Sequence, residues 1–373
     1  MTTLCKTNKK TVKKRILVMA GGTGGHVFPA LAVAKKLANE GWEVLWLGTA
    51  ERMEAKLVPQ HGFNIEFIDI KGVRGNGIIR KLMAPIKIIK AIAQARFVIK
   101  AFQPDVVIGM GGFASGPGGI AAKLCGIPLV LHEQNAIPGM TNKLLSKIAT
   151  KVLCAFEGTF EPSVNAKVVG NPIRAELESL RGETWSIDDK ALKVLIVGGS
   201  LGAGIFNDWM PLIAAELSRI HSLTLWHQVG KGNLQAVTKA YQKQQQQDSV
   251  QVTEFIDDMQ AAYQWADVVI CRAGALTVSE LAMVGKPSIL VPYPHAVDDH
   301  QTLNANVLVN AGGAFLLPQP IASVELFVEK LSLLAENRAE LAAMGKQAKQ
   351  VATINATEQV AAVCKALTEK EVA

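Results

Sequence analysis

Short apolar runs alternate with longer amphipathic stretches along the whole chain. The run Arg15–Ala20 leads through a glycine-rich turn to helical periodicity at 27–39 and then to a second apolar run, Glu43–Leu47. The same order returns after the apolar run Leu192–Val197. Short buried strands joined by helices are typical of parallel sheets with helices on both faces, so the pattern predicts an α/β protein.

The stretch Val268–Pro292 shows this pattern most clearly, as a strand, a tight turn, a helix and a second strand. Gly285 and Pro287 mark the end of the helix. At its start, Gly274 lets the backbone approach a ligand, and the first amides have no partner within the helix. These amides and the positive end of the helix dipole form a candidate phosphate site at Ala275, Leu276 and Thr277.

Glu280 follows Leu276 by four residues, so it lies on the same face of this helix, about 5.4 Å further along. A diphosphate at the helix start would leave an adjoining ribose near this carboxylate, which accepts hydrogen bonds from sugar hydroxyls. The alternative is an ordinary buried strand–helix–strand unit in which Glu280 is solvated or acts as a cap.

A first glycine-rich turn, Gly21–His26, follows the first strand. It does not match GxGxxG, because Val27 occupies the third glycine position counted from Gly22. The next strand also closes on 47–49 without a ribose-binding acid, which disfavours a dinucleotide oxidoreductase. What remains is a loop whose amides can hold a phosphate, with His26 at the helix start, where a histidine also often serves packing.

Two more glycine-rich turns follow strands, at 109–119 and 198–203. The strand Pro128–Leu131 ends in the polar run 132–135. Ligands of open parallel sheets bind at the carboxyl ends of the strands, so we expect these turns and polar side chains to line a site.

Length and composition fit two domains rather than one. The chain has 373 residues, of which 49% are hydrophobic, and the irregular polar stretch 175–190 is the expected linker. No apolar run reaches the ~18 residues of a bilayer span, and the basic stretch 1–14 does not lead into a secretory signal. The five cysteines are scattered without a CxxC pair, which indicates a reduced cytosolic setting and no metal site.

Charge divides the chain into a basic and an acidic half. Residues 1–174 hold 24 Lys+Arg against 10 Asp+Glu, whereas residues 175–373 hold 15 against 22. Between Lys71 and Lys100, eight cations and no acid are mixed with aliphatic residues, which predicts a surface that binds anionic lipid. The cations are not interleaved with a run of aromatic side chains, so we expect no nucleic-acid partner. The alternative is a core helix with a solvated basic face.

Eight segments together resemble one family of bacterial enzymes, the UDP-N-acetylglucosamine:undecaprenyl-diphospho-muramoylpentapeptide N-acetylglucosaminyltransferases (the MurG family). No single segment is decisive, but eight in this order are highly specific and cover almost the whole chain. The segments lie at 19–34, 109–119, 132–145, 170–174, 197–203, 254–259, 271–280 and 298–304.

The resemblance implies a GT-B fold, in which two Rossmann-like domains with parallel sheets face a cleft. It places an acceptor- and membrane-binding domain at 13–174, joined by a C-terminal helix at 354–373 that crosses back, and a UDP-sugar domain at 175–353. The implied reaction is inverting transfer of N-acetylglucosamine from UDP-N-acetylglucosamine to the 4-hydroxyl of undecaprenyl-diphosphate-linked N-acetylmuramoyl-pentapeptide. The enzyme would be peripheral, on the anionic cytoplasmic face of the inner membrane.

The resemblance also implies roles for particular residues. The backbone of Ile256 would contact uracil, Glu280 the ribose, and Ser200 the diphosphate together with the helix start. The loop around Gln301 varies within the family, and His300 could take part of its role. The implied contacts of UDP-N-acetylglucosamine are Thr23, Gly24, Gly25, Asn135, Arg174, Ser200, Ile256, Ala275, Leu276, Thr277, Val278, Ser279, Glu280 and Gln301.

Transfer requires a base that takes the proton of the acceptor hydroxyl. His26 is the candidate, because it ends a glycine-rich turn at a strand's carboxyl edge and imidazole, with an ordinary pKa of about 6.5, exchanges protons near neutrality. Glu133 or His132 on the neighbouring strand end is the alternative, and a structural role for His26 is a third possibility.

Other functions remain open at this point. The acidic pairs of the chain are adjacent and no DxD spacing occurs, so we expect neither a metal ion nor another cofactor. A GT-B transferase with a different sugar or acceptor is one alternative, and a catalytically idle membrane scaffold is another. A P-loop ATPase is disfavoured because the chain has no GxxxxGK[ST] string.

Overall fold

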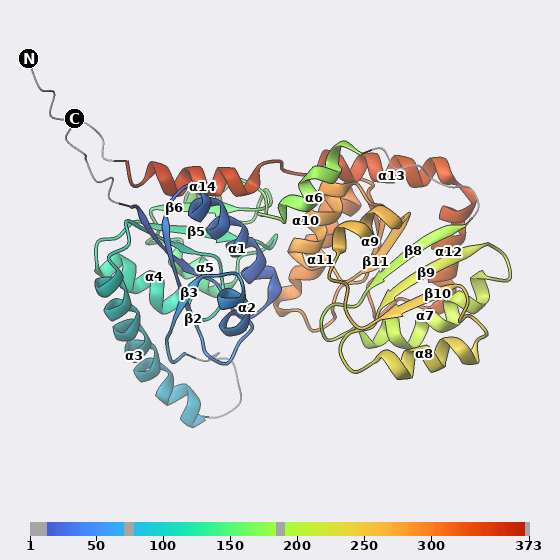
Figure 1. Cartoon of the computed structure of the whole chain (residues 1–373), viewed down its shortest axis with the longest axis horizontal. Coiled ribbons are helices and arrows are strands. Elements are labelled where there is room, and N and C mark those ends of the chain that lie inside the picture. Colours follow the sequence, from blue (N-terminus) through green and yellow to red (C-terminus); the bar gives the residue numbers. More distant parts are fainter. Residues whose placement is uncertain (1–12, 71–77, 184–190, 370–373) are drawn as a thin grey trace, which may run out of the picture.

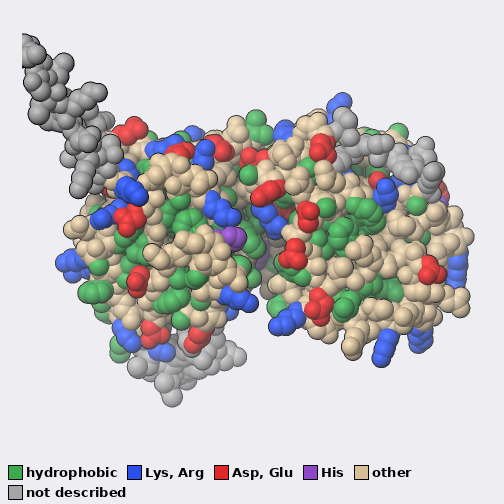
Figure 2. All heavy atoms as spheres, viewed as in Figure 1, with side chains coloured by type: hydrophobic (Ala, Val, Ile, Leu, Met, Phe, Trp, Pro, Cys, Tyr) green, Lys and Arg blue, Asp and Glu red, His purple; other side chains and the backbone are tan. Residues whose placement is uncertain are grey.

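The computed structural model describes residues 13–70, 78–183 and 191–369. It consists of two α/β lobes side by side, each built on one parallel sheet (Figure 1). Figure 2 shows that the surface is hollowed into a notch between the lobes. Within the described ranges, no helix is long and apolar enough to cross a bilayer.

The sheet of the first lobe has seven strands in the order β3-β2-β1-β4-β5-β6-β7. The register pairs Met19 with Leu47 on one side and with Gly109 on the other, so the central strands end level with one another. The strands are β1 Arg15–Met19, β2 Glu43–Gly48, β3 Asn64–Phe67, β4 Val106–Gly109, β5 Leu129–Glu133, β6 Lys151–Cys154 and β7 Lys167–Val168.

Helices cover both faces of this sheet, which is why its central strands are apolar throughout. Ile16 and Val18 pack on one face with Ala30 of α1, whereas Leu17 and Met19 pack on the other face. The helices of this lobe are α1 Gly24–Asn39, α2 Glu54–Gln60, α3 Ile78–Phe102, α4 Ser115–Leu124, α5 Met140–Leu145 and the 3₁₀ turn η1 Pro162–Val164.

The sheet of the second lobe has six strands in the order β10-β9-β8-β11-β12-β13. The strands are β8 Leu192–Val197, β9 Leu223–Gln228, β10 Val250–Thr253, β11 Val268–Cys271, β12 Ser288–Leu290 and β13 Ala314–Leu316. The helices are α7 Gly204–Leu217, α8 Leu234–Lys243, α9 Met259–Trp265, α10 Ala275–Val284, α11 His300–Asn310, α12 Val324–Glu336, α13 Arg338–Gln350 and the 3₁₀ turn η3 Val297–Asp299.

The last helix, α14 Ala356–Ala366, returns to the first lobe and lies along α1 (Figure 1). Val360 and Cys364 are buried in the core that also contains Ala30. An ion pair of 2.9 Å between Lys365 Nζ and Glu40 Oε2 adds an exposed contact. The two lobes are therefore joined twice by the chain.

The alternation of strands and helices predicted from the sequence is confirmed, but two segments differ. The stretch 175–190 was expected to be irregular, yet it begins with α6 Ala175–Ser179 and the 3₁₀ turn η2 Leu180–Gly182. Leu177 and Leu180 are buried against the core of the second lobe, which gives this polar stretch an apolar side. Residues 184–190 lie outside the described residues.

The strand predicted to end at Leu131 continues to Glu133 as β5. Its neighbour β6 pairs Leu153 with His132 and Cys154 with Glu133, so both polar residues lie inside the sheet and are buried. Their polarity had suggested a strand end. The sequence also gave no signal for β3, β7 and β13, which are short.

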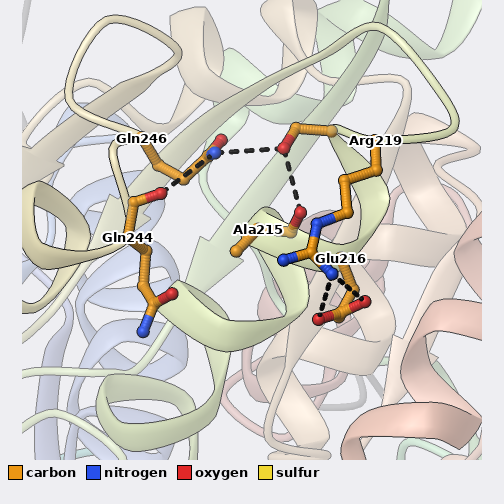
Figure 3. Close-up of polar contacts among 6 residues, drawn as sticks. Ala215, Glu216, Arg219, Gln244 and Gln246 are labelled. Atoms are coloured by element: carbon orange, nitrogen blue, oxygen red, sulfur yellow. Dashed lines mark hydrogen bonds and ion pairs between the residues drawn. The ribbon is translucent and has the colours of Figure 1, made fainter.

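The helix α8 ends at Lys243, within the glutamine-rich stretch 239–247. Beyond it, Gln246 Nε2 donates to Ser218 Oγ at 3.0 Å and to the Gln244 carbonyl at 3.3 Å (Figure 3). The segment after α8 is thereby bonded to the residue that follows α7.

Candidate active site

The two glycine-rich turns of the first lobe pack directly on each other. β1 and β4 are neighbours, so the turns that follow them lie side by side. A Cβ at Gly112 would lie 2.6 Å from the Gly21 carbonyl oxygen, and one at Gly111 would lie 2.6 Å from Cδ2 of His26. Both glycines also have positive φ, +97° at Gly111 and +88° at Gly112. Conformation and space therefore both require glycine here.

His26 lies in the first turn of α1 with its imidazole over Gly111. Its Nδ1 is 3.1 Å from the Gly21 carbonyl oxygen, and the side chain is partly exposed. Donation from Nδ1–H to this carbonyl leaves the Nε2 lone pair for another group. The N-cap Thr23 makes no side-chain capping bond, so the first amides of α1 are available to a ligand.

Glu54, in the first turn of α2, is hydrogen-bonded to the first glycine-rich turn and to Thr49 after β2. Its side chain is buried, and Oε2 accepts a hydrogen bond of 2.9 Å from the Gly22 amide. Oε1 accepts from the Thr49 amide at 3.1 Å and from the Thr49 hydroxyl at 2.7 Å. This acid carries no recognisable spacing in the sequence and was not predicted as part of the site.

Glu133 is buried, and both of its carboxylate oxygens are occupied. Oε1 accepts from the amide and side chain of Asn135, and Oε2 accepts from Gly139 N and Asn142 Nδ2, all between 2.9 and 3.1 Å. The neighbouring His132 is also enclosed, and burial lowers its pKa to about 4. These contacts shape the loop after β5, and both side chains are buried with partners inside the protein.

The amino end of α10 forms the opposite part of the site. Gly274 is its N-cap, and no side chain caps the first amides. β8 lies beside β11, with Val197 paired to Cys271, so the third glycine-rich turn lies beside this helix start. Ser200 on that turn is exposed. The uncapped amides of α10 and the exposed Ser200 thus lie at one edge of the sheet, which suits a diphosphate.

Glu280 is 5% exposed, yet one of its oxygens lacks a hydrogen-bond partner. Oε2 accepts from the Tyr263 hydroxyl at 3.2 Å, while Oε1 has only an ion-pair distance of 3.8 Å to Arg174 Nε. Burial raises the pKa of the carboxyl, and Arg174 and the Tyr263 hydroxyl act in the opposite direction. A buried acceptor without a donor is rare, and it suits a hydroxyl supplied by a ligand.

Arg174 connects the lobes at this point. Its guanidinium lies 5.2 Å from the ring centre of Phe28 on α1, a cation–π distance, while its other neighbour is Glu280 on α10. Phe28 also packs against the core of the second lobe. The glycine-rich turn of the first lobe and the ribose candidate of the second are therefore held close together.

Two asparagines complete the contact between the lobes. Asn304 Oδ1 accepts from the Ala136 amide at 2.8 Å, and its Nδ2 donates to the Ala273 carbonyl and to Asn135 Oδ1, both at 3.2 Å. Asn171 Nδ2 donates to Ser279 Oγ at 3.0 Å. The loop after β5 is thus bonded to the start of α10.

The remaining expected donor contacts lie around the same helix start. Ile256 is buried in one core with Leu276, so only its backbone can face a ligand. Val278 is fully buried, and Gln301 Oε1 accepts from the Tyr293 amide at 2.8 Å. The structure thus gathers the predicted residues at one edge of each sheet.

Comparison with known proteins agrees with this arrangement. The N-terminal domain of glycosyltransferase family 28 matches residues 16–154, and the C-terminal domain of that family matches residues 193–360. A Shewanella oneidensis protein is 71% identical over 357 residues, which are 96% of this chain and 98% of that protein. It is named UDP-N-acetylglucosamine--N-acetylmuramyl-(pentapeptide) pyrophosphoryl-undecaprenol N-acetylglucosamine transferase. The chain belongs to glycosyltransferase family 28.

Two further relatives extend the similarity. A Shewanella loihica protein of the same name is 69% identical over 360 residues, covering 96% of this chain and 98% of its own length. The crystal structure of Acinetobacter baumannii MurG superposes with a TM-score of 0.81 at 44% identity, covering 95% of this chain and 99% of that one. The resemblance drawn from eight sequence segments is confirmed, as is the GT-B architecture of this glycosyltransferase.

Several residues that shape the site of this glycosyltransferase were not predicted from its sequence. Phe28, Tyr263, Asn171 and Asn304 each contact a predicted residue, and Glu54 holds the turn that carries His26. Phe28, Asn171 and Asn304 lie within three of the recognised segments, which was the only available signal.

Proposed function

We propose that this glycosyltransferase moves N-acetylglucosamine from UDP-N-acetylglucosamine to the 4-hydroxyl of undecaprenyl-diphosphate-linked N-acetylmuramoyl-pentapeptide. The principal support is 71% identity, over nearly the full length of both chains, to a Shewanella oneidensis transferase whose name states this donor and acceptor. The unpartnered Glu280 oxygen beside the start of α10 supports the donor half of the proposal.

We place the donor against the second lobe. The Ile256 backbone meets the uracil and Glu280 Oε1 accepts from the ribose. The diphosphate lies against Ser200 and the amides of α10. Because these amides and the helix dipole are fixed in advance, they stabilise the charge that develops on the leaving UDP. The further donor contacts are Thr23, Gly24, Gly25, Asn135, Arg174, Val278, Ser279 and Gln301.

We assign the base to His26. As the acceptor oxygen attacks the anomeric carbon, its proton moves to Nε2 of His26 and the bond from that carbon to the diphosphate oxygen breaks on the opposite face. Glu133 suits this role less well, because its two oxygens already accept four hydrogen bonds from the loop that it shapes.

We further propose that α3 rests on an anionic membrane surface at the cytoplasmic face of the inner membrane. Ile86, Ile89 and Phe97 are 60%, 66% and 75% exposed on this helix, and Lys87 and Lys90 are exposed beside them. Cations beside exposed apolar side chains favour binding at a lipid interface. Residues 71–77 of the predicted surface lie outside the described residues, as do the side chains of 78–83.

The division of labour follows the lobes. Residues 13–174 with the returning segment 354–373 bind the lipid-linked acceptor, and residues 175–353 bind the nucleotide sugar. The basic charge of residues 1–174 suits a diphosphate-lipid acceptor on an anionic surface.

Turnover of UDP-N-acetylglucosamine with lipid-linked muramoyl-pentapeptide tests the function directly, with release of UDP and formation of the disaccharide as the two measurements. We expect both products in equal amounts. Turnover only with another nucleotide sugar or acceptor would indicate a different GT-B transferase. Binding of UDP without any turnover would indicate a catalytically idle scaffold.

The variant His26→Ala tests the assignment of the base. A general base contributes about 10²–10⁴ in rate, so we expect kcat to fall by that factor while the affinity for UDP-N-acetylglucosamine stays near wild type. Steady-state kinetics with each substrate varied in turn measure both. A loss confined to the acceptor KM would make His26 a binding residue instead.

A further inference from the structure

We propose that Glu54 is a positioning residue for the transfer reaction and that it acts on His26 through a single peptide group. The inference rests on the proposed role of His26 as the base. Glu54 contacts one end of the peptide group that joins Gly21 to Gly22, and His26 contacts the other end.

Glu54, the peptide group between Gly21 and Gly22, and His26 form a hydrogen-bond relay. Two hydrogen bonds define its geometry. The Gly22 N–H donates to Glu54 Oε2 at 2.9 Å, and the Gly21 carbonyl accepts from His26 Nδ1 at 3.1 Å. The N–H and the C=O belong to the same planar, conjugated unit, in which they point in opposite directions. The carboxylate and the imidazole are therefore linked by one polarisable group.

Polarisation gives the relay its chemical effect. A carboxylate that accepts from the N–H polarises the peptide group and increases the negative charge on the carbonyl oxygen. The carbonyl is then a stronger acceptor for His26 Nδ1–H. Such chains strengthen each bond by roughly 10–30%. A stronger bond at Nδ1 holds the proton there and keeps Nε2 as the free proton acceptor. In serine proteases a carboxylate does this by direct contact with the histidine, whereas here a peptide group lies between them.

Hydrogen bonds and packing fix the position of the Glu54 side chain. Its carboxylate accepts three hydrogen bonds, from the Gly22 amide, the Thr49 amide and the Thr49 hydroxyl. An ionised carboxylate only accepts hydrogen bonds, so three donors suit it. A Cβ on Gly48 would lie 2.8 Å from Glu54 Cγ, and one on Gly21 would meet its carboxyl group. Two glycines therefore make room for this one side chain.

The imidazole is held from its other side as well. A Cβ on Gly111 would lie 2.6 Å from Cδ2 and 2.8 Å from Nε2 of His26, so the ring rests against that backbone. Contact on one face and a hydrogen bond at Nδ1 restrict the ring. The relay therefore adds an electronic effect to a position that packing already restricts.

Long-range ¹H–¹⁵N spectra of ¹⁵N-histidine-labelled protein test the relay without any turnover. The chain has seven histidines, and the His26 signals are assigned by their loss in His26→Gln. In the neutral wild-type ring we expect the proton on Nδ1. In Glu54→Gln we expect a mixture of tautomers, whereas Glu54→Asp, which keeps the charge, restores Nδ1–H at least in part. A wild-type proton on Nε2 would overturn the proposal.

Kinetics provide the second measurement. Loss of a group that orients a metal-bound histidine typically costs about 10–100-fold. By analogy, we expect Glu54→Gln to lower kcat by about that factor with the donor KM little changed. The acid limb of the kcat–pH profile should also move to lower pH, because Nε2 loses basicity. Glu43→Gln, an exposed carboxylate of the same lobe paired with Arg15, is the matched control and should leave the profile unchanged.

The outcomes separate the relay from the proposed function. A fall in kcat without any change in tautomer or in the pH profile would make Glu54 merely structural and overturn the proposal. A Glu54-dependent tautomer together with full activity of His26→Ala would support the hydrogen-bond relay but remove His26 as the base. If Glu54→Gln fails to fold, the wild-type and Glu54→Asp spectra still decide the question.

Discussion

Glu280 illustrates how one residue can set binding against stability. Burial raises the pKa of its carboxyl despite Arg174 and the Tyr263 hydroxyl. A group whose pKa is higher in the folded than in the unfolded state binds more protons when folded, so the free energy of unfolding falls as the pH rises through that interval. The ionised Glu280 therefore destabilises the protein near neutrality when no nucleotide is bound.

The variant Glu280→Gln removes this charge and keeps the size of the side chain. Near neutral pH we expect it to melt at a higher temperature than wild type, with the difference shrinking as the pH falls toward 4.5, the ordinary carboxyl pKa. We expect its UDP affinity to fall about 10- to 150-fold, since hydrogen bonds to a charged group contribute about 1.5–3 kcal/mol. Melting curves across pH and calorimetric titration with UDP measure both.

The exposed Glu161→Gln serves as the control for this prediction and should change neither quantity. Unaltered UDP binding by Glu280→Gln would show that the ribose lies elsewhere. Lower stability of the variant at neutral pH would instead show that the ion pair with Arg174 outweighs the effect of burial.

At the scale of elements, the packing of the two glycine-rich turns of the first lobe allows a matched pair of substitutions. Gly112 and Gly41 have nearly the same φ, +88° and +90°, but only Gly112 faces another backbone. Alanine in this left-handed conformation costs about 1–2 kcal/mol at either site.

We expect Gly112→Ala to lower kcat sharply, because its Cβ must displace Gly21 and with it the carbonyl that accepts from His26. Gly41→Ala should lose only the stability due to its backbone conformation and keep its kcat. Steady-state kinetics and chemical denaturation of both variants measure these effects. Equal kcat in the two variants would mean that the contact between the turns does not position the site.

Substitutions on the helix α3 test the proposed binding to a membrane surface. Glutamate at both Ile86 and Ile89 adds negative charge and removes two exposed aliphatic side chains, so we expect binding to anionic vesicles to weaken by at least about tenfold. High salt should weaken the wild-type interaction as well. Vesicle co-sedimentation measures the affinity.

The double variant Ile220→Glu/Ile321→Glu is the control, because these residues are 61% and 69% exposed but lie on the second lobe. It should bind vesicles like wild type. Equal binding of wild type to neutral and anionic vesicles would contradict the electrostatic part of the proposal.

At the scale of the whole molecule, Asn304 bonds the two lobes to each other. Asn304 lies on α11 of the second lobe, yet it bonds to the loop after β5 and to the residue before Gly274 at the start of α10. Removing it leaves the buried Ala273 carbonyl and the part-buried Ala136 amide without this partner, and an unsatisfied buried group costs about 1–3 kcal/mol.

We therefore expect Asn304→Ala to lower the free energy of unfolding by about 1–3 kcal/mol and to raise the donor KM, because the loop after β5 loses its bond to α10. The exposed Asn310→Ala on the same helix is the control. Denaturation, steady-state kinetics and small-angle scattering follow stability, binding and the orientation of the lobes. A donor KM equal to wild type would separate this contact from donor binding.

The sequence by itself determined the alternation of strands and helices, the three glycine-rich turns, the helix start that follows Gly274 and the family. These features depend on local signals, such as apolar runs, glycines at sharp turns and free amides in the first turn of a helix. The positions of His26 and Glu280 on their helices were predictable for the same reason, since each depends on its own helix.

Only the tertiary structure decided which polar groups are partners. Glu54 meets an amide 32 residues earlier, and Asn304 meets one 168 residues earlier. The sequence suggested that Glu133 follows the end of its strand, but pairing with β6 and four hydrogen bonds from the following loop and α5 enclose it. Whether a buried polar group is satisfied depends on groups that only folding brings near it, so a pattern along the chain cannot decide it.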